Sequence, residues 1–215
     1  MKKISMISNK IEDYCTINSS HVPRYLLELE RETNLRTVNP RMLSGDLQGR
    51  VLSMISKMLL PKRVLEVGTF TGYASLCLAE GLDREGLLET IEVNPELETI
   101  IQKYFQKSPF KDRIKLYMGD AKEILKKLPG PYDLVFLDAS KEEYIQYFDE
   151  IKPKLKSGGI MLVDNVLWSG KVIEDSDDST ARAIHRFNRY VLSDDEMEIV
   201  MLPLRDGLSM IRKRG

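Results

Sequence analysis

The sequence predicts an α/β fold in which a doubly wound, mostly parallel sheet is covered by helices on both faces. From residue 63 onward, short apolar runs alternate with amphipathic helical patterns, and this alternation is typical of a parallel sheet. The last two apolar runs are joined at Asp206-Gly207, a dipeptide that favours a tight hairpin turn. One strand of this terminal hairpin must therefore run antiparallel to the other strands.

The individual elements follow from hydrophobic periodicity, taken in chain order. Two or three helices are expected before the sheet, two of them at residues 21–32 and 44–59, and Pro61 ends the helix at 44–59. Short apolar strands are expected at residues 63–67, 87–92, 114–117, 134–137 and 160–163. Helices with apolar residues at i, i+3, i+4 and i+7 are expected at residues 73–80, 96–105, 121–128, 142–155 and 180–192. The terminal hairpin is expected to pair residues 198–204 with residues 208–212.

Length and composition limit the class of protein. A chain of 215 residues can bury a core of its own, and we expect one domain, with a helical cap at residues 1–60 and an α/β core at residues 61–215. The net charge of −1 gives no general attraction to nucleic acid or to an anionic membrane. Cys15 and Cys77 lack the spacing of a disulfide framework or a zinc site. With no secretory or membrane-spanning segment, we expect a cytoplasmic protein.

The loop after the first predicted strand is the strongest local signal. Glu66 and Gly68 end an apolar strand, and a helical pattern starts at Tyr73, an arrangement that suits a nucleoside-type ligand. A dinucleotide fingerprint would need glycine where Phe70 and Tyr73 stand, so a ligand without phosphates is favoured. This argues against a nicotinamide-dependent oxidoreductase, which we keep as a less favoured alternative.

The next two strand ends carry further acidic residues. Glu92 ends the second strand 24 residues after Gly68, where a carboxylate suits hydrogen bonds to ribose hydroxyls. Asp120 follows the third strand, and it either caps the next helix or meets an adenine amino group.

The fourth and fifth strand ends predict a cation site. Asp138 follows the fourth strand, and Asp164 and Asn165 follow the fifth, so neighbouring parallel strands would bring these oxygen ligands together. Such a set suits Mg²⁺ or another hard divalent cation. Lys141 lies one helical turn after Asp138, and a nearby cation would lower its pKa toward that of a general base. The competing interpretations are a helix-capping box at residues 140–143 and a simple turn at Asp164.

Other candidates carry weaker signals. Trp168 lies in a polar loop, where it either walls a substrate pocket or simply packs. Asp206 is a candidate substrate contact with a plain turn explanation. In residues 1–20, a helix face is expected to cover the site or pack on a partner subunit, formed by Ile4, Ile7, Ile11 and Tyr14.

Five segments resemble a known enzyme family. Residues 64–73 resemble the S-adenosylmethionine loop of class I methyltransferases. Residues 136–144 and 162–170 are similar to the metal-dependent O-methyltransferases of the catechol and caffeoyl-coenzyme A type, and residues 41–49 and 204–208 match further family segments. The resemblance runs from about Met42 to the C-terminus. Residues 166–170 follow the plant and bacterial pattern, so strict catechol specificity is not implied.

The resemblance implies a Rossmann-like, seven-stranded sheet with an antiparallel final strand, and a homodimer. Metal ligation carries over to Asp138, Asp164 and Asn165, with Mg²⁺, Mn²⁺ or Ca²⁺ as the cation, and the base role carries over to Lys141. The implied S-adenosylmethionine contacts come from several strand ends and helix starts, namely Ser44, Glu66, Gly68, Thr69, Ala74, Glu92, Ala121 and Asp138.

The implied function is transfer of a methyl group from S-adenosylmethionine to a hydroxyl of a small aromatic acceptor of the vicinal-diol type. Asp138 and Lys141 would act at the reacting hydroxyl. The alternative acceptor is a hydroxylated uridine in transfer RNA, for which a single small basic face would suffice. A nicotinamide-dependent oxidoreductase is the remaining, less favoured alternative.

Overall fold

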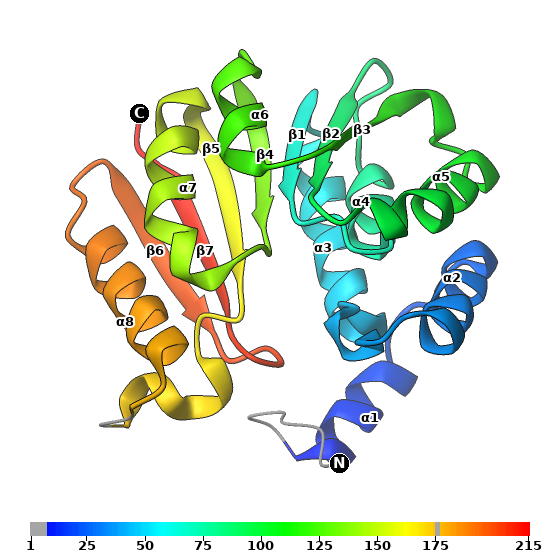
Figure 1. Cartoon of the computed structure of the whole chain (residues 1–215), viewed down its shortest axis with the longest axis horizontal. Helices are drawn as coiled ribbons and strands as arrows, with labels where there is room; N and C mark the ends of the chain where they lie inside the picture. Colours follow the sequence, from blue (N-terminus) through cyan, green and yellow to red (C-terminus); the bar gives the residue numbers. More distant parts are fainter. Residues whose placement is uncertain (1–7, 175–176) are drawn as a thin grey trace.

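The computed structural model describes residues 8–174 and 177–215, and it is built around a seven-stranded sheet in the order β3-β2-β1-β4-β5-β7-β6 (Figure 1). Strand β7 is antiparallel to both β5 and β6, while β1 to β5 pair in parallel. The predicted fold is therefore confirmed, including the antiparallel strand of the terminal hairpin. The strands are β1 Arg63–Val67, β2 Leu87–Glu92, β3 Ile114–Met118, β4 Tyr132–Leu137, β5 Leu155–Asp164, β6 Met197–Leu202 and β7 Leu208–Lys213.

Helices cover both faces of the sheet (Figure 1). Successive strand residues point to opposite faces, so Val64 packs in the cluster that includes α3 and α4, while Leu65 packs in the cluster that includes α6, α7 and α8. The helices are α1 Asn9–Ile17, α2 Arg24–Arg36, α3 Gly45–Leu59, α4 Tyr73–Ala79, α5 Glu98–Lys107, α6 Ala121–Lys127, α7 Tyr144–Ile151 and α8 Ser179–Leu192. Short 3₁₀ turns are η1 Pro40–Met42, η2 Pro95–Leu97, η3 Lys111–Arg113, η4 Lys141–Glu143, η5 Lys152–Lys154 and η6 Trp168–Ile173.

Helix α3 lies unusually close to α4, and a glycine makes this possible. A Cβ atom at Gly49 would lie 2.7 Å from Cε1 of Tyr73 and 2.9 Å from Sγ of Cys77. Helix α2 packs outside them on α4 and α5, and Thr33 donates a hydrogen bond to Thr71 in the loop after β1 (3.0 Å). The N-terminal helices thus support the carboxyl edge of the sheet from one side.

Prolines and glycines explain where the predicted boundaries were wrong. Helix α2 begins after Pro23 rather than at residue 21, because the residue before a proline is disfavoured in helical conformation. Helix α7 ends at Ile151 rather than at residue 155, because Pro153 has no N–H for the helical ladder. Strand β5 begins at Leu155 rather than at residue 160, since the polar, glycine-containing start of this strand hides its pattern.

The N-terminal prediction is tested only in part. Ile11 and Tyr14 lie on α1, which packs on α3, and their side chains are 54% and 69% exposed. Ile4 and Ile7 lie outside the described residues. Within residues 8–174 and 177–215, no helix combines the length and apolarity needed to cross a membrane.

Candidate functional site

The loop after β1 and the loop after β4 are in direct contact at the carboxyl edge of the sheet. Gly68 has φ +100°, and a Cβ atom there would overlap the backbone carbonyl oxygen of Asp138. The Asp138 N–H donates to the carbonyl of Val67 at 2.9 Å. Glycine is needed at this position both for its conformation and for the close approach. The loop predicted to bind the methyl donor, after β1, and the loop predicted to hold the cation and the acceptor, after β4, are therefore adjacent.

A small cavity opens at this junction. Five of its ten lining residues belong to the eight predicted cofactor contacts, and they are Ser44, Gly68, Thr69, Ala74 and Asp138. The other lining residues are Met42, Leu43, Phe70, Tyr73 and Phe136, which we did not predict as contacts. Their apolar and aromatic side chains carry no chemical signature, although Phe70 and Tyr73 belong to the loop that the sequence singled out. Mixed apolar and polar linings of this kind are typical of small-molecule sites.

Glu66 lies beneath the cavity rather than in its lining. Its side chain is fully buried and points toward α4, where Oε2 accepts hydrogen bonds from Ser75 and, at 2.5 Å, from Thr90. Within the described residues, Oε1 has no hydrogen-bond partner. Burial raises the pKa of Glu66 to about 8, and the charges of Asp138 and Glu92 add to the effect. The site thus contains a buried carboxyl group that, among the described residues, receives no hydrogen bond from a positively charged side chain.

Glu92 and Ala121 also lie outside the cavity lining. The Glu92 carboxylate accepts the backbone N–H of Phe70 at 2.7 Å and that of Asn94 at 2.8 Å, so it fixes the loop after β1. Ala121 is buried at the start of α6. Asp120 precedes Ala121, and its side chain accepts the N–H of Lys122 at 2.9 Å. Of the two roles expected for Asp120, the structure thus shows the helix cap.

Asp138 forms an ion pair with Lys141 in the loop after β4. Its Oδ1 lies 2.7 Å from Nζ of Lys141, and both side chains are mostly buried. Burial alone would lower the pKa of Lys141, but the Asp138 charge outweighs it and raises that pKa above its usual range. The sequence predicted a lowered Lys141 pKa on the assumption that a cation is bound nearby. Without that cation, Asp138 raises the pKa of Lys141 instead.

Asp164 lies on the neighbouring strand end and is 4% exposed. Gln48 of α3 donates from Nε2 to its Oδ2 at 2.7 Å, and the N–H of Asn165 donates to its Oδ1 at 2.8 Å. Tyr144 donates its hydroxyl to the Asp164 backbone carbonyl at 3.0 Å. Burial and the charge of Asp138 raise the pKa of Asp164 to about 6. The contact with Gln48 was not predicted.

The residues fit a hard divalent cation. Asp138 and Asp164 are carboxylates whose charges repel each other in a poorly solvated place, and Asn165 follows Asp164 at φ +58°. A cation between such groups would remove the repulsion, and oxygen donors are what Mg²⁺ prefers. Among residues 8–174 and 177–215, no three or more His, Cys, Asp or Glu side chains form a metal-holding group. The predicted set has two carboxylates and one amide, so it does not require such a group.

Trp168 and Asp206 lie in the loops beside this edge, outside the cavity lining. Asp206 accepts the N–H of Ser169 and thereby ties the hairpin turn to the loop after β5. Trp168 donates from Nε1 to Oδ2 of Asp178 at 3.2 Å, which links the same loop to the start of α8. Both residues have a clear role in holding loops, and their substrate role stays a prediction.

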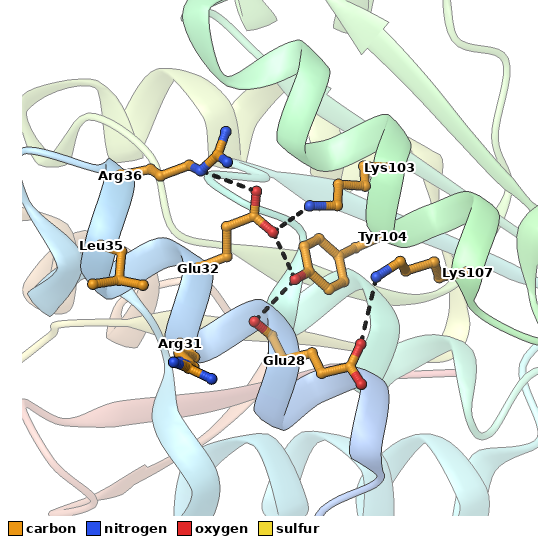
Figure 2. Close-up of a pocket in the computed structure, with 8 residues that line it drawn as sticks. All are labelled: Glu28, Arg31, Glu32, Leu35, Arg36, Lys103, Tyr104 and Lys107. Atoms are coloured by element: carbon orange, nitrogen blue, oxygen red, sulfur yellow. Dashed lines mark hydrogen bonds and ion pairs between the residues drawn. The ribbon is translucent and has the colours of Figure 1, made fainter.

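A second cavity lies between α2 and α5, away from all predicted site residues (Figure 2). Its charged groups largely pair with one another: Glu32 bonds to Lys103, Arg36 and the Tyr104 hydroxyl, while Glu28 pairs with Lys107. The pKa of Glu32 is lowered, chiefly by its hydrogen bond to Lys103. This cavity is therefore the surface of an ion-pair network between two helices.

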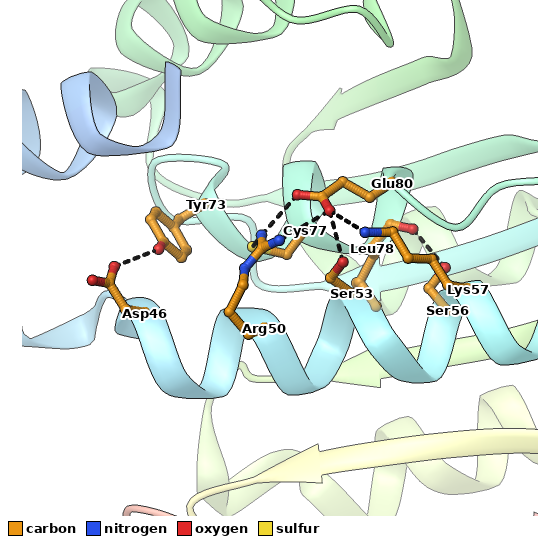
Figure 3. A network of polar contacts seen from close by, with 9 residues as sticks. All are labelled: Asp46, Arg50, Ser53, Ser56, Lys57, Tyr73, Cys77, Leu78 and Glu80. Atoms are coloured by element: carbon orange, nitrogen blue, oxygen red, sulfur yellow. Dashed lines mark hydrogen bonds and ion pairs between the residues drawn. The ribbon is translucent and has the colours of Figure 1, made fainter. Parts of the chain in front are cut away.

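Another polar network joins α3 to α4 (Figure 3). The Glu80 carboxylate accepts two hydrogen bonds from Arg50, at 2.7 and 3.0 Å, one from Lys57 at 2.6 Å and one from Ser53 at 2.7 Å. Burial would raise the pKa of Glu80, but these donors together lower it. Glu80 is thus a mostly buried carboxylate that the protein neutralises with its own cations.

Comparison with known proteins gives a consistent result. The chain matches the O-methyltransferase family over residues 16–214. Caffeoyl-CoA O-methyltransferase 2 of Populus trichocarpa is 30% identical over 204 residues, which span 89% of this chain and 82% of the relative. The solved structure of the SAH-bound methyltransferase PaMTH1 of Podospora anserina has a TM-score of 0.89 at 29% identity and full coverage of both chains. An O-methyltransferase of Bacillus cereus in complex with SAH has a TM-score of 0.89 at 23% identity over 95% of this chain and 97% of the other, which supports the fold.

Proposed function

Because the chain belongs to the O-methyltransferase family, we propose that it transfers the methyl group of S-adenosylmethionine to one hydroxyl of a small aromatic vicinal diol held by a divalent cation. The family membership contradicts the nicotinamide-dependent alternative. An RNA acceptor is not favoured, since the net charge is −1 and the curated relative named above is a caffeoyl-CoA O-methyltransferase.

The cavity between the loops after β1 and β4 is the proposed donor site. S-adenosylmethionine supplies an electrophilic methyl group on a positively charged sulfur. The Asp138 carboxylate in its lining gives this region a negative potential that favours such a cation, and a bound cation would in turn favour the ionised form of Glu66 beneath the cavity. Ser44, Thr69 and Ala74 would contact the ligand from the other walls, while Glu92 holds the backbone of Phe70 in place.

Asp138, Asp164 and Asn165 are the proposed ligands of the divalent cation. When bound, the cation would supply positive charge that lowers the pKa of an acceptor hydroxyl. With the cation bound and the Lys141 ammonium deprotonated as a result, Nζ would receive the hydroxyl proton, and its contact with Asp138 at 2.7 Å keeps it beside the reacting group. The burial of Asp164 and Lys141 would limit competing water at this point.

One observation carries the proposal: Asp138 belongs to both parts of the site. It lines the donor cavity, and it is also ion-paired with Lys141 and electrostatically coupled to Asp164. A methyl donor in the cavity and a hydroxyl acceptor at the cation would therefore meet at this residue. Holding two reactants in such proximity is the main contribution expected of the protein in a direct displacement.

An acceptor screen tests the proposal. The protein would be incubated with methyl-labelled S-adenosylmethionine and a catechol, a matched monophenol, or transfer RNA containing hydroxyuridine, each with Mg²⁺ or with excess EDTA. We expect label in the catechol product only, and only with Mg²⁺. Full catechol methylation in EDTA would contradict the role of the metal, and label in the RNA alone would replace the proposed acceptor.

The proposal includes a homodimer. Met54 and Met58 lie one turn apart on the outer side of α3, and they are 56% and 70% exposed, which would suit a partner surface. Light scattering after gel filtration should give twice the mass of the chain, and the monomer mass would contradict this part of the proposal.

A further inference from the structure

Gln48 is a buried polar residue that the proposed chemistry does not use. It lies in the first turns of α3, is 1% exposed and donates from Nε2 to Oδ2 of Asp164, 116 residues further along the chain. Only the amide nitrogen can donate to a carboxylate, so the orientation of this amide is determined. Its Oε1 is buried and has no hydrogen-bond partner among the described residues. A buried amide that leaves one atom unsatisfied costs stability, which indicates a role other than stability.

The hydrogen bond acts on the part of Asp164 that would meet the cation. The N–H of Asn165 holds Oδ1, and within the described chain Gln48 provides the one side-chain hydrogen bond to this carboxylate. Gln48 is neutral, so it orients the carboxylate without neutralising it. Lys141 behaves differently toward Asp138, because its positive charge competes with any cation there. Asp164 is thus held in place without a hydrogen bond to a positively charged side chain of the described chain.

Helix α3 provides a rigid support for Gln48. Arg205, in the turn between β6 and β7, donates to the carbonyl of Leu43 at 2.9 Å and to the carbonyl of Ser44. Gly49 allows close packing of α3 on Tyr73. Ser44, which lines the donor cavity, and Gln48 are four residues apart and therefore lie on the same face of this segment. One fixed helix start thus contacts both the donor cavity and the cation ligand.

We propose that Gln48 is a positioning residue that holds the Asp164 carboxylate in the orientation needed to bind the divalent cation. The inference rests on the proposed function, because it assumes that Asp164 is a cation ligand. Partners that orient metal ligands contribute about 10- to 100-fold to metal affinity or activity. Removing the Gln48 amide is therefore expected to weaken cation binding while the donor cavity keeps its affinity.

The test is calorimetric titration of MgCl₂ into the full chain, alongside titration of S-adenosylmethionine. In Gln48→Met, which keeps the length but not the amide, we expect the Kd for Mg²⁺ to rise about tenfold or more, with little change in the Kd for S-adenosylmethionine. Gln48→Asn, whose amide is one methylene too short, should also weaken Mg²⁺ binding and provides a second variant if Gln48→Met does not fold. Ser53→Ala is the matched control, because Ser53 is buried on the same helix but bonds to Glu80.

The outcomes separate the inference from the proposed function. If Asp164→Asn loses Mg²⁺ binding while both Gln48 variants bind as the wild type does, the inference is wrong and the metal site stands. If wild type and Asp164→Asn give the same titration, the proposed metal site is wrong and the inference falls with it. A similar loss in Ser53→Ala would mean that general loosening of α3 explains the effect, which also overturns the inference.

Discussion

Two buried carboxylate sites flank helix α3, and the protein treats them in opposite ways. Glu80, between α3 and α4, receives Arg50, Lys57 and Ser53, and its pKa is lowered (Figure 3). Glu66 and Asp164, at the carboxyl edge of the sheet, receive only neutral donors, and their pKa values are raised. The protein thus supplies positively charged partners at one site and only neutral donors at the other, and Glu66 and Asp164 are also more deeply buried than Glu80.

The difference shows which charges the fold leaves for ligands. A buried carboxylate without a cation costs stability, so a site built only for stability would supply one, as the Glu80 site does. At the sheet edge the missing positive charge corresponds to what the proposed reaction brings, namely a sulfonium donor and a divalent cation. Perturbed pKa values that gather in one cleft are typical of functional sites.

Replacing Asp164 should separate activity from stability most strongly. In Asp164→Asn we expect methyl transfer to fall by about 10³-fold or more, since a cation ligand is lost, a bigger change than loss of an orienting partner. The free energy of unfolding should stay level or rise, because a buried charge is removed. Initial rates and thermal unfolding measure the two effects, and an active variant or an unfolded one would contradict the prediction.

Glu66 should make stability depend on pH. Its pKa is raised from the ordinary 4.5 to about 8, so between these values the folded protein binds more protons than the unfolded chain. The stabilising contribution of the protonated group is full below pH 4.5 and is lost as the pH rises to about 8. The loss is of the order of a few kcal/mol.

The measurement is urea unfolding of wild type and Glu66→Gln across this pH range. The difference in unfolding free energy between them should change steadily in favour of the variant as the pH rises. Parallel curves would show that Glu66 is charged throughout and that the contrast with Glu80 is wrong.

Breaking the Glu80 network should destabilise the fold and spare the chemistry. Glu80→Gln leaves the mostly buried Arg50 without its carboxylate, and removal of one partner of such a pair costs about 3 kcal/mol. At low temperature the folded fraction should bind S-adenosylmethionine with wild-type affinity. Unchanged stability, or lost ligand affinity in protein that is demonstrably folded, would contradict the assignment of this network to stability alone.

The smallest effect is expected for Ser53→Ala. It removes one hydrogen bond to the Glu80 carboxylate and leaves Arg50 and Lys57 in place, so the cost should be about 1 kcal/mol. Chemical unfolding measures the change, and Gln48→Met is the comparison on the same helix. A cost equal to that of Glu80→Gln would mean that the hydroxyl, rather than the charge pair, holds the network together.

Much of the site could be predicted because it is local to strand ends. Asp138, Glu92 and Asp164 each follow an apolar strand, and parallel strands end at the same edge of a sheet, so the sequence sufficed to bring them together. The loop around Gly68 was recognisable for the same reason. The mostly parallel sheet followed from the alternation of elements and the terminal hairpin from the turn at Asp206, whereas the order of the strands was not predicted.

The rest depends on contacts that no local pattern encodes. The Gln48–Asp164 and Arg205–Leu43 hydrogen bonds join residues that are 116 and 162 positions apart, so they exist only where the helical cap meets the end of β5 and the terminal hairpin. Glu66 receives its hydrogen bonds from the hydroxyls of Ser75 and Thr90, and no sequence motif marks these two residues as its partners. Tertiary packing therefore decides whether a carboxylate receives a positively charged partner. The sequence alone does not show that Glu80 has such partners and that Glu66 has only hydroxyl donors.

Thermal unfolding of wild type, Glu80→Gln and Asp164→Asn, each with and without Mg²⁺, tests whether Asp164 serves as a ligand of the cation. A ligand at about 100 times its Kd stabilises the folded state by about 2.7 kcal/mol, which raises the Tm of a protein of this size by roughly 5–10 °C. We predict this rise in wild type and in Glu80→Gln, and none in Asp164→Asn. An equal rise in all three proteins, or none in wild type, would contradict the claim that the Asp164 carboxylate is left without a positively charged partner so that it can bind a cation.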